Sequence, residues 1–151
     1  MINGTLIIGL ATFFLAGISS CNFAPGSYPY TEDYTLKIKE LDLVNIIQEF
    51  KKDNPDYCVP DEVQLKDGRR GEDDYWYHIY FYYKDENKIL NTWVRQLDRE
   101  NTTFAFVNVN EGLTLGNWKR INKDFSHKEN KLEKAKFEQR ILDRIKVKIK
   151  E

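Results

Sequence analysis

The segment of residues 75–83 constrains the fold of this chain more than any other feature of its sequence. Eight of its nine residues are aromatic or β-branched, and only His78 departs from that pattern. Side chains of these kinds favour the pleated, half-buried surface of a β-strand. A polar turn at residues 84–87 follows, and residues 88–96 have the composition of a second strand. We therefore predict a β-hairpin in this part of the chain.

Further strands are predicted on both sides of this hairpin in the sequence. Residues 102–109 are apolar at the positions of both faces, which is typical of a central strand. Residues 113–121 are predicted to be a weaker strand or an extended segment. Before the hairpin, residues 35–39 alternate between apolar and polar side chains, which predicts a short strand. A further short strand at residues 63–65 is an option within the connector of residues 56–74.

Two amphipathic helices are predicted, one before and one after this strand-rich region. The first has apolar residues at i, i+3, i+4 and i+7, which form one stripe along a helix: Leu43, Ile46, Ile47 and Phe50. The second begins at a capping box, in which Ser126 is followed three residues later by Glu129. Its apolar stripe recurs every four residues and consists of Phe137, Ile141, Ile145 and Ile149, flanked by Leu132 and Leu142.

The order of these elements is one strand, one helix, a meander of three or four strands and a long final helix. This order predicts an α+β fold, in which helices cover one side of an antiparallel sheet. We expect three to five strands, with the N-terminal-side helix and the long C-terminal helix packed on one face. The chain is 41% hydrophobic and 31% charged, as is ordinary for a soluble domain. Residues 32–151 are therefore predicted to form a single domain and to be monomeric.

Charge is distributed unevenly along the chain. Every charged side chain lies after position 31, since Glu32 is the first. Residues 6–18 are an uncharged run whose thirteen residues suit a signal-peptide core, whereas a bilayer-spanning helix needs about 20. The net charge is −1, and attraction to nucleic acid needs a clustered positive field. We therefore expect an exported protein that does not bind nucleic acid.

The end of this apolar run resembles the lipobox of bacterial lipoprotein precursors. Residues 18–21, Ile-Ser-Ser-Cys, reproduce its pattern of a branched apolar residue, two small residues and a cysteine. The resemblance implies that residues 1–20 are a signal peptide cleaved before Cys21, and that a diacylglycerol is attached to this cysteine. Residues 1–5 contain no Lys or Arg, which departs from the pattern. The alternative is an uncleaved anchor helix in which Cys21 has no special role.

The lipobox resemblance also implies a place in the cell. Two or three acyl chains on Cys21 make a stable membrane anchor, and residues 21–31, rich in Pro, Gly and Ser, are predicted to be a tether. Asn22 follows the cysteine, whereas an aspartate there favours retention at the inner membrane in well-studied lipoprotein sorting. We therefore expect a protein anchored in the bacterial cell envelope, at the outer membrane, facing the periplasm or the cell surface.

The part of the chain after Cys21 resembles small uncharacterised lipoproteins of Gram-negative bacteria. The likeness covers most of this part and is carried by residues 49–55 (EFKKDNP), residues 75–83 (YWYHIYFYY), residues 103–107 (TFAFV) and the C-terminal helix. No single motif among them is diagnostic. The group brings no known activity with it, so the resemblance implies a location and no chemistry.

Residues that could carry chemistry are few and scattered. The two histidines, His78 and His127, lie in separate predicted elements, and no carboxylate spacing suggests a shared metal. Cys58 is the only cysteine besides Cys21, and no neighbouring base that would activate it as a nucleophile is visible. We therefore expect no metal, no cofactor and no enzymatic activity.

The aromatic segment of residues 75–83 is the best candidate for a binding surface. Its side chains alternate between two faces, and the set with Trp76 and His78 is the more polar. Depending on register, the neighbouring strand can extend this set with Asn91, Trp93 and Arg95. Exposed Tyr, Trp and Arg are frequent in interface hot spots, and they can equally stack on sugars. The alternative is a second buried layer beneath the connector of residues 56–74. The predicted surface consists of Trp76, His78, Tyr80, Tyr82, Trp93 and Arg95.

The predicted loop at residues 67–74 concentrates charge. Arg69 and Arg70 are followed by three adjacent carboxylates at residues 72–74. The alternating ligand spacing of a calcium loop is missing. A solvated loop is the simpler interpretation, and a contact loop is the functional one, because loops on a rigid scaffold commonly carry binding.

Two functions fit these observations. The first is a membrane-anchored envelope lipoprotein whose non-catalytic domain binds a protein or a glycan through the aromatic sheet face. The second is an immunity or inhibitor protein that blocks a toxin or an envelope enzyme, which the small size and single domain suit. The sequence offers neither a nucleophile with its base nor a metal cluster, so an enzyme is the least supported class.

Overall fold

The computed structural model describes residues 28–150. The predicted signal peptide, Cys21 and most of the predicted tether lie outside the described residues. Between residues 28 and 150, no helix combines the length and the apolar character needed to cross a membrane.

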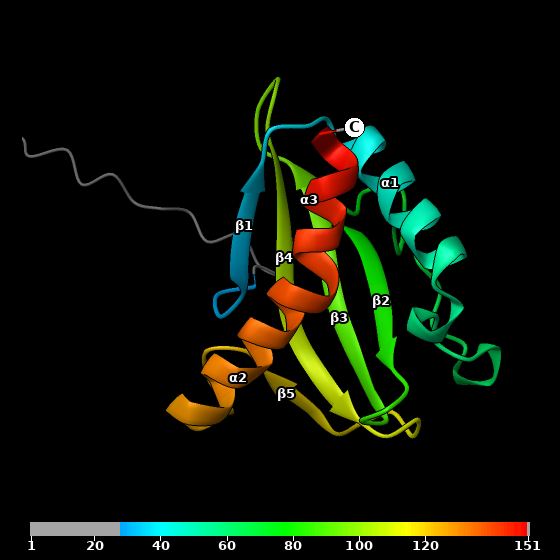
Figure 1. Ribbon diagram of the computed structural model, residues 1–151, viewed down its shortest axis with the longest axis vertical. Coiled ribbons are helices and arrows are strands. Elements are labelled where there is room, and N and C mark those ends of the chain that lie inside the picture. Colours follow the sequence, from blue (N-terminus) through cyan, green and yellow to red (C-terminus); the bar gives the residue numbers. More distant parts are fainter. Residues whose placement is uncertain (1–27, 151) are drawn as a thin grey trace, which may run out of the picture.

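A five-stranded antiparallel sheet and two helical segments make up the described part of the chain (Figure 1). The strands are β1 (Glu32–Leu36), β2 (Tyr77–Tyr83), β3 (Lys88–Gln96), β4 (Thr102–Glu111) and β5 (Trp118–Arg120). The helices are α1 (Glu40–Asp53), α2 (His127–Phe137) and α3 (Asp143–Lys150), with a π-helical turn, Glu138–Leu142, between α2 and α3. Short 3-10 turns at Pro55–Tyr57 and Asp61–Val63 follow α1. The predicted α+β class is confirmed.

Strand β4 is the central strand of the sheet. The strand order is β1-β4-β3-β2, and every pairing is antiparallel. Strand β1 pairs with the first half of β4 and β5 pairs with its second half, so that both share one edge of β4. Residues 102–109 are apolar on both faces because both faces of β4 are covered. Phe104 and Phe106 lie in the core beneath the helices, and Ala105 and Val107 lie in a second cluster against which Tyr28 and Trp76 pack.

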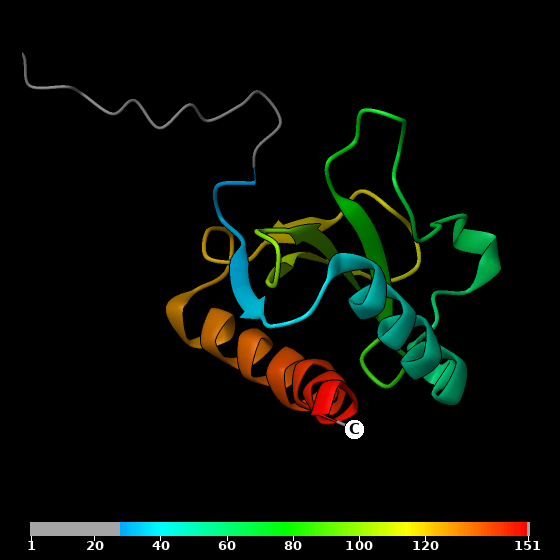
Figure 2. The same ribbon diagram turned by 90° about the horizontal axis from the view of Figure 1, so that it is seen from above.

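The hydrophobic core fills the space between one face of the sheet and the helices. Its fully buried residues come from every layer: Ile79, Phe81, Val94, Phe104 and Phe106 from the strands, Leu43, Ile47 and Phe50 from α1, and Phe137, Ile141 and Ile145 from the C-terminal segment. The ring of Phe137 stacks on that of Phe106 with 4.7 Å between centroids. Figure 2 shows both helical segments on this side of the sheet and the connector before β2 rising on the other.

The π-helical turn Glu138–Leu142 explains the four-residue repeat of the C-terminal stripe. In an α-helix with 3.6 residues per turn, side chains four apart rotate steadily around the axis. A π-turn has more residues per turn and absorbs one extra residue. Phe137, Ile141 and Ile145 therefore all stay on the sheet side, where they are fully buried. The predicted flanking residue Leu132 instead faces solvent.

Two of the predicted strands differ from the structure. The first strand is Glu32–Leu36 and not residues 35–39, because its pairing with β4 covers all five of its residues and the chain bends immediately afterwards. The predicted strand at residues 63–65 is wrong. Asp61–Val63 form a 3-10 turn, and Gln64 has a φ of 61°, a left-handed conformation that interrupts an extended backbone.

Candidate functional site

A row of polar side chains crosses the sheet face that turns away from the helices. Cross-strand pairing aligns Tyr80 of β2 with Asn91 of β3, and Asn91 with Asn108 of β4. Asn108 in turn aligns with Arg120 of β5. Directly paired residues project on the same side of a sheet, so the row is continuous over four strands. Asparagine is depleted in strands, and two neighbouring asparagines at its centre therefore call for a physical explanation.

A β-bulge in β4 determines where Asn108 points. Before the bulge, Phe104 and Phe106 face the helices and are fully buried. Strict alternation would send Asn108 to the same side and place an amide in the hydrophobic core. The register of the β3–β4 pairing shifts at this point and skips Val107, which moves Asn108 to the opposite face. Bulges characteristically redirect a side chain in this way.

The connector before β2 is fastened over one end of this face. Gly68 forms an antiparallel bridge with His78 through two main-chain hydrogen bonds of 2.9 and 3.0 Å. Asp67 Oδ1 accepts the N–H of Tyr80 at 2.9 Å, and Asp67 Oδ2 accepts from Lys51 Nζ at 2.5 Å. Lys51 Nζ also donates to the Tyr80 carbonyl at 2.9 Å. These bonds occupy the outer edge of β2, which would otherwise be open to pairing with another strand.

A cleft with a volume of 270 Å³ lies over the polar row. Three residues of the row form its floor, and its walls come from the N-terminal segment, the connector and the loop that leads into β5. We call this hollow the asparagine cleft, and its lining residues are Tyr28, Leu65, Arg70, Tyr80, Asn91, Asn108, Leu115 and Trp118. A second hollow of 260 Å³ lies beside it and shares Tyr28 and Asn108.

Two carbonyl oxygens of the asparagine cleft have no hydrogen-bond partner in the described chain. They are the Oδ1 atoms of Asn91 and Asn108, both fully shielded from solvent. Asn91 as a whole is only 6% exposed. A buried acceptor without a partner costs about 1–3 kcal/mol. A ligand in the cleft can satisfy these acceptors once a rotation of the two amides turns their oxygens towards it.

Arg70 places a positive charge beside these oxygens. Its Nη2 donates to the Tyr80 hydroxyl at 3.0 Å, which leaves the hydrogen of that hydroxyl for another acceptor. Arginine–carboxylate pairs within residues 28–150 involve Arg69, Arg120 and Arg140, but not Arg70. Burial raises the pKa of the Tyr28 phenol, and the charge of Arg70 opposes that rise. The asparagine cleft is thus lined by one cation and no anion.

His78 is buried next to the asparagine cleft and does not line it. Burial lowers the pKa of its imidazole, and the charge of Arg70 lowers it further, so the ring is neutral at pH 7. Its Nε2 lies 3.1 Å from Asp74 Oδ2. Burial would raise the pKa of Asp74, but hydrogen bonds from the backbone N–H groups of Arg70 and Trp76 lower it. The carboxylate therefore accepts the Nε2 hydrogen and fixes the end of the connector.

Three of the six predicted surface residues are buried. His78, Tyr80 and Trp93 are 2%, 5% and 7% exposed. The connector lies over His78 and Tyr80, as in the alternative of a second layer beneath it. Tyr28 lies beside Trp93, with 6.1 Å between the ring centroids. Tyr28 belongs to the stretch predicted as a tether, yet its side chain packs on the sheet.

The other three predicted residues lie towards the ends of this face. Trp76 is half-buried edge-on against Tyr28, with ring centroids 5.2 Å apart. Arg95 is exposed, and its guanidinium lies 5.9 Å from the centre of the Trp76 ring. At the far end of β2, the Tyr82 hydroxyl donates to Asn87 Oδ1 at 2.9 Å. Of the six predicted residues, only Tyr80 lines the asparagine cleft.

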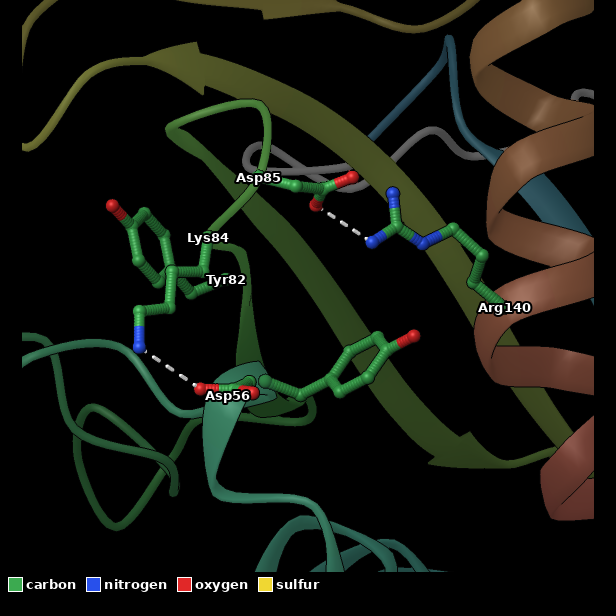
Figure 3. Close-up of a pocket in the computed structure, with 6 residues that line it drawn as sticks. Asp56, Tyr82, Lys84, Asp85 and Arg140 are labelled. Carbon is green, nitrogen blue, oxygen red and sulfur yellow. Dashed lines mark hydrogen bonds and ion pairs between the residues drawn. The ribbon is translucent and has the colours of Figure 1, made fainter.

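A larger hollow of 380 Å³ lies between the β2–β3 turn and the C-terminal helical segment (Figure 3). Its charged groups neutralise one another: Lys84 Nζ lies 3.2 Å from Asp56 Oδ1, and Arg140 Nη2 lies 2.7 Å from Asp85 Oδ1. Arg140 also lies over the ring of Tyr83, 4.0 Å from its centre. Since each of these four charges has an opposite partner, the hollow joins the helix to the hairpin and leaves no charge for a ligand.

The described residues offer few groups for binding a metal or for thiol chemistry. No group of three or more His, Cys, Asp or Glu side chains in residues 28–150 could hold a metal ion. Cys58 is a half-buried free thiol whose Sγ lies 3.6 Å from the Lys51 carbonyl oxygen. We take the asparagine cleft as the candidate site because two residues of its lining carry buried oxygens without a partner.

Sequence patterns place Asn91 on this face and mark Arg70 as part of a candidate contact loop, but they do not identify Asn108 or Tyr28. A signal exists for Asn108, because asparagine is depleted in strands and this one interrupts an otherwise apolar segment. The charge of the loop at residues 67–74 is a signal for Arg70, although it does not place this residue beside Asn91, and no signal exists for Tyr28. Both residues reach the cleft only because the connector and the N-terminal segment fold back over the sheet.

No family model, no curated protein and no solved structure matches this chain. A fold by itself does not define a function, since unrelated activities share the same folds. Function is therefore inferred from the chemistry of the asparagine cleft and from the predicted anchor.

Proposed function

We propose that this protein is a lipid-anchored lipoprotein of the bacterial cell envelope, and that its domain binds a polar ligand in the asparagine cleft without transforming it. The lipid is carried by Cys21. Tyr28, which lines the cleft, follows this cysteine after seven residues. Seven extended residues span at most about 25 Å. The asparagine cleft is therefore held close to the membrane surface, and its ligand is one found there.

The unpaired oxygens of Asn91 and Asn108 carry this proposal. Natural folds pair nearly all of their buried polar atoms, so each exception calls for an explanation. Six buried side-chain atoms in residues 28–150 have no partner, and two of them are neighbours in one cross-strand pair whose residues line the same cleft. After a rotation of the two amides, hydrogen-bond donors on one ligand would satisfy both oxygens.

The composition of the asparagine cleft argues for binding and against catalysis. Its lining includes no carboxylate, imidazole, thiol or lysine. The imidazole of His78, close by, is buried and bonded to Asp74. General acid–base catalysis needs a titratable group within hydrogen-bond reach of the reacting atoms. Arg70 and the tyrosine hydroxyls can orient a ligand, but they are poor proton acceptors at neutral pH.

Photocrosslinking in cells that produce the full chain tests the binding function. A photoreactive amino acid replaces Leu115, which lies at the cleft and is 42% exposed. The matched control carries it at Val147 on α3, which is 58% exposed and remote from the cleft. We expect an adduct with an envelope component from position 115 only. Asn91→Leu, which keeps the side-chain size and removes the amide, should reduce that adduct at least fivefold.

Two outcomes would contradict the proposed binding function. One is adducts of equal intensity from positions 115 and 147. The other is an adduct from position 115 that Asn91→Leu leaves unchanged. If the protein were soluble and carried no lipid, the proposed anchor would be wrong, but this result would not bear on binding in the cleft.

A further inference from the structure

We propose that the ligand of the asparagine cleft is an acidic sugar unit, namely a single ring that carries a carboxylate and adjacent hydroxyl groups. This inference rests on the proposed binding function and names the chemistry of its ligand. Three features of the cleft lead to it: the two amides on the floor, the unpaired guanidinium on the wall, and the apolar side chains that face them.

The two amides on the floor fit neighbouring hydroxyl groups. A carboxamide offers an acceptor oxygen and a donor nitrogen side by side. Two hydroxyls on adjacent ring carbons match this arrangement, because one can donate to the oxygen while the other accepts from the nitrogen. Asn91 and Asn108 repeat it on adjacent strands, and their Oδ1 atoms are the unpaired acceptors. A ring with several hydroxyls can therefore satisfy both residues.

The guanidinium of Arg70 fits a carboxylate. Arginine binds carboxylates through paired, charge-assisted N–H bonds, and these are stronger than bonds between neutral groups. In the described chain, Arg70 donates from its side chain only to Tyr80 and pairs with no carboxylate. The hydrogen of the Tyr80 hydroxyl is also available to a ligand oxygen. With one cation and no anion in the lining, the cleft matches a ligand with a single negative charge.

The size and walls of the asparagine cleft fit one ring. Its 270 Å³ is just below the lower end, about 300 Å³, of the pockets that hold drug-sized molecules. Trp118, Leu65 and Leu115 supply apolar surface for the C–H groups of a sugar ring. The adjoining hollow, which shares Tyr28 and Asn108, gives room for a neighbouring unit if the ring is part of a chain.

The two simpler ligands each leave part of the cleft unsatisfied. A neutral sugar pairs with the amides of Asn91 and Asn108 but leaves the charge of Arg70 without a partner. A simple carboxylate pairs with Arg70 but leaves the buried oxygens unpaired. Comparing three small probes therefore separates the contributions: methyl glucuronide carries both groups, methyl glucoside only the hydroxyls, and acetate only the carboxylate.

The experiment is a titration of the full chain in zwitterionic detergent, whose head groups contain no sugar to compete for the cleft. Nuclear magnetic resonance of the side-chain amides of Asn91 and Asn108 reports on the floor directly. We expect methyl glucuronide to shift both signals in a saturable manner. Methyl glucoside and acetate should each bind at least tenfold more weakly. The amide of Asn110, which is buried and already hydrogen-bonded, should not shift.

Variants assign the preference to individual side chains. Arg70→Gln should reduce the affinity for methyl glucuronide to that for methyl glucoside. Arg99→Gln makes the same change in net charge at an exposed loop residue, and it should leave the affinity within twofold of the parent chain. Asn91→Leu should abolish the binding of both sugars. Cooperative unfolding of each variant shows that it remains folded.

Equal affinity for methyl glucuronide and methyl glucoside would overturn the acidic sugar, and so would a preference that survives Arg70→Gln. If neither sugar shifts the amides while the crosslink from position 115 persists and depends on Asn91, the acidic sugar is wrong and the binding function stands. If the sugars and the crosslink both fail, the inference and the proposed function fall together.

Discussion

Asn91 and Asn110 are both buried on the helix-free face of the sheet, on paired strands, but only Asn110 is satisfied. Asn110 Nδ2 donates to the carbonyls of Gly112 and Thr114, and its Oδ1 accepts the backbone N–H of Asn117. Asn91 Oδ1 has no partner in the described chain. The Asn110 amide therefore holds the loop before β5 in place, whereas the Asn91 oxygen makes no hydrogen bond within the described chain.

Asn91→Leu should stabilise the protein, although it removes the centre of the proposed site. The substitution takes away a buried, unpaired acceptor whose cost is about 1–3 kcal/mol, and it keeps the side-chain volume. We expect the free energy of unfolding to rise by about 1 kcal/mol or more, measured by chemical denaturation without ligand. A gain in stability coupled to a loss of binding is typical of residues retained for function.

Asn110→Leu is the matched control for this prediction. It leaves two carbonyls and one N–H group without partners, and we expect it to lower the free energy of unfolding by about 3 kcal/mol. If Asn91→Leu were as destabilising as Asn110→Leu, the Asn91 amide would have a structural role. The asparagine cleft would then lose its main support as a binding site.

The protein should lose stability as the pH falls below about 6.5, and His78 should cause part of that loss. Burial lowers the pKa of His78 in the folded state, while the unfolded imidazole keeps a pKa near about 6.5. Below that pH the unfolded chain binds more protons than the folded chain, so the free energy of unfolding decreases until the folded pKa is reached. Denaturation curves at about pH 7.5 and about pH 5 measure this loss.

His78→Gln should flatten this pH dependence, because it removes the titrating group. His127→Gln, at an exposed position, should leave the dependence as it is in the parent protein. The denaturation curves are kept at or above about pH 5 for a reason. Asp74, whose pKa is lowered in the folded state, begins to lose its own contribution to the free energy of unfolding below about pH 4. An unchanged slope in His78→Gln would mean that other groups cause the pH dependence.

Local patterns predicted most of the elements of this fold. The alternation and composition of residues 75–83 and 88–96 indicate a hairpin, and the structure has one between β2 and β3. The capping box at Ser126 is formed with Glu129 as predicted. These features depend on residues close together in the sequence, so they can be inferred from one amino-acid sequence. The π-turn is visible in the sequence only indirectly, as an apolar repeat of four.

The asparagine cleft was less predictable because it depends on contacts between distant segments. The bulge in β4 reverses the side to which Asn108 points, and no local pattern specifies a bulge at Val107. Arg70 reaches the cleft only because Gly68 pairs with His78, and Tyr28 does so by packing against Trp76. Predicting the exposure of the aromatic face therefore required knowing which loop covers it.

Cys21→Ala should yield a protein without lipid that either keeps its signal segment or is released in soluble form. The prediction follows from the Ile-Ser-Ser-Cys sequence at the end of the apolar run. Metabolic labelling with a fatty-acid analogue, followed by fractionation of the cells, measures both consequences. Cys58→Ala is the control and should be labelled as strongly as the parent chain. Equal labelling of Cys21→Ala and the parent would exclude the lipid anchor.

Glu133 is a buried carboxylate whose charge is compensated mainly by Lys88. It is 5% exposed, its Oε1 lies 2.6 Å from Lys88 Nζ, and its Oε2 has no partner in the described chain. Lys136 is a weaker partner, with its Nζ 3.6 Å from the same Oε1. The pair joins the first residue of β3 to α2, so the cost of burying both charges is tied to the docking of the helix on the sheet.

Lys88→Met should therefore lower the free energy of unfolding by about 3 kcal/mol, because it leaves Glu133 buried without its main partner. Replacing both residues, with Lys88→Met and Glu133→Leu together, should recover most of this loss, since well-packed apolar groups commonly substitute for a buried ion pair. Denaturation of the two single variants and the double variant gives the coupling energy directly. If the double variant were as unstable as the sum of the two single variants, Lys88 and Glu133 would act independently and the pair would not join β3 to α2.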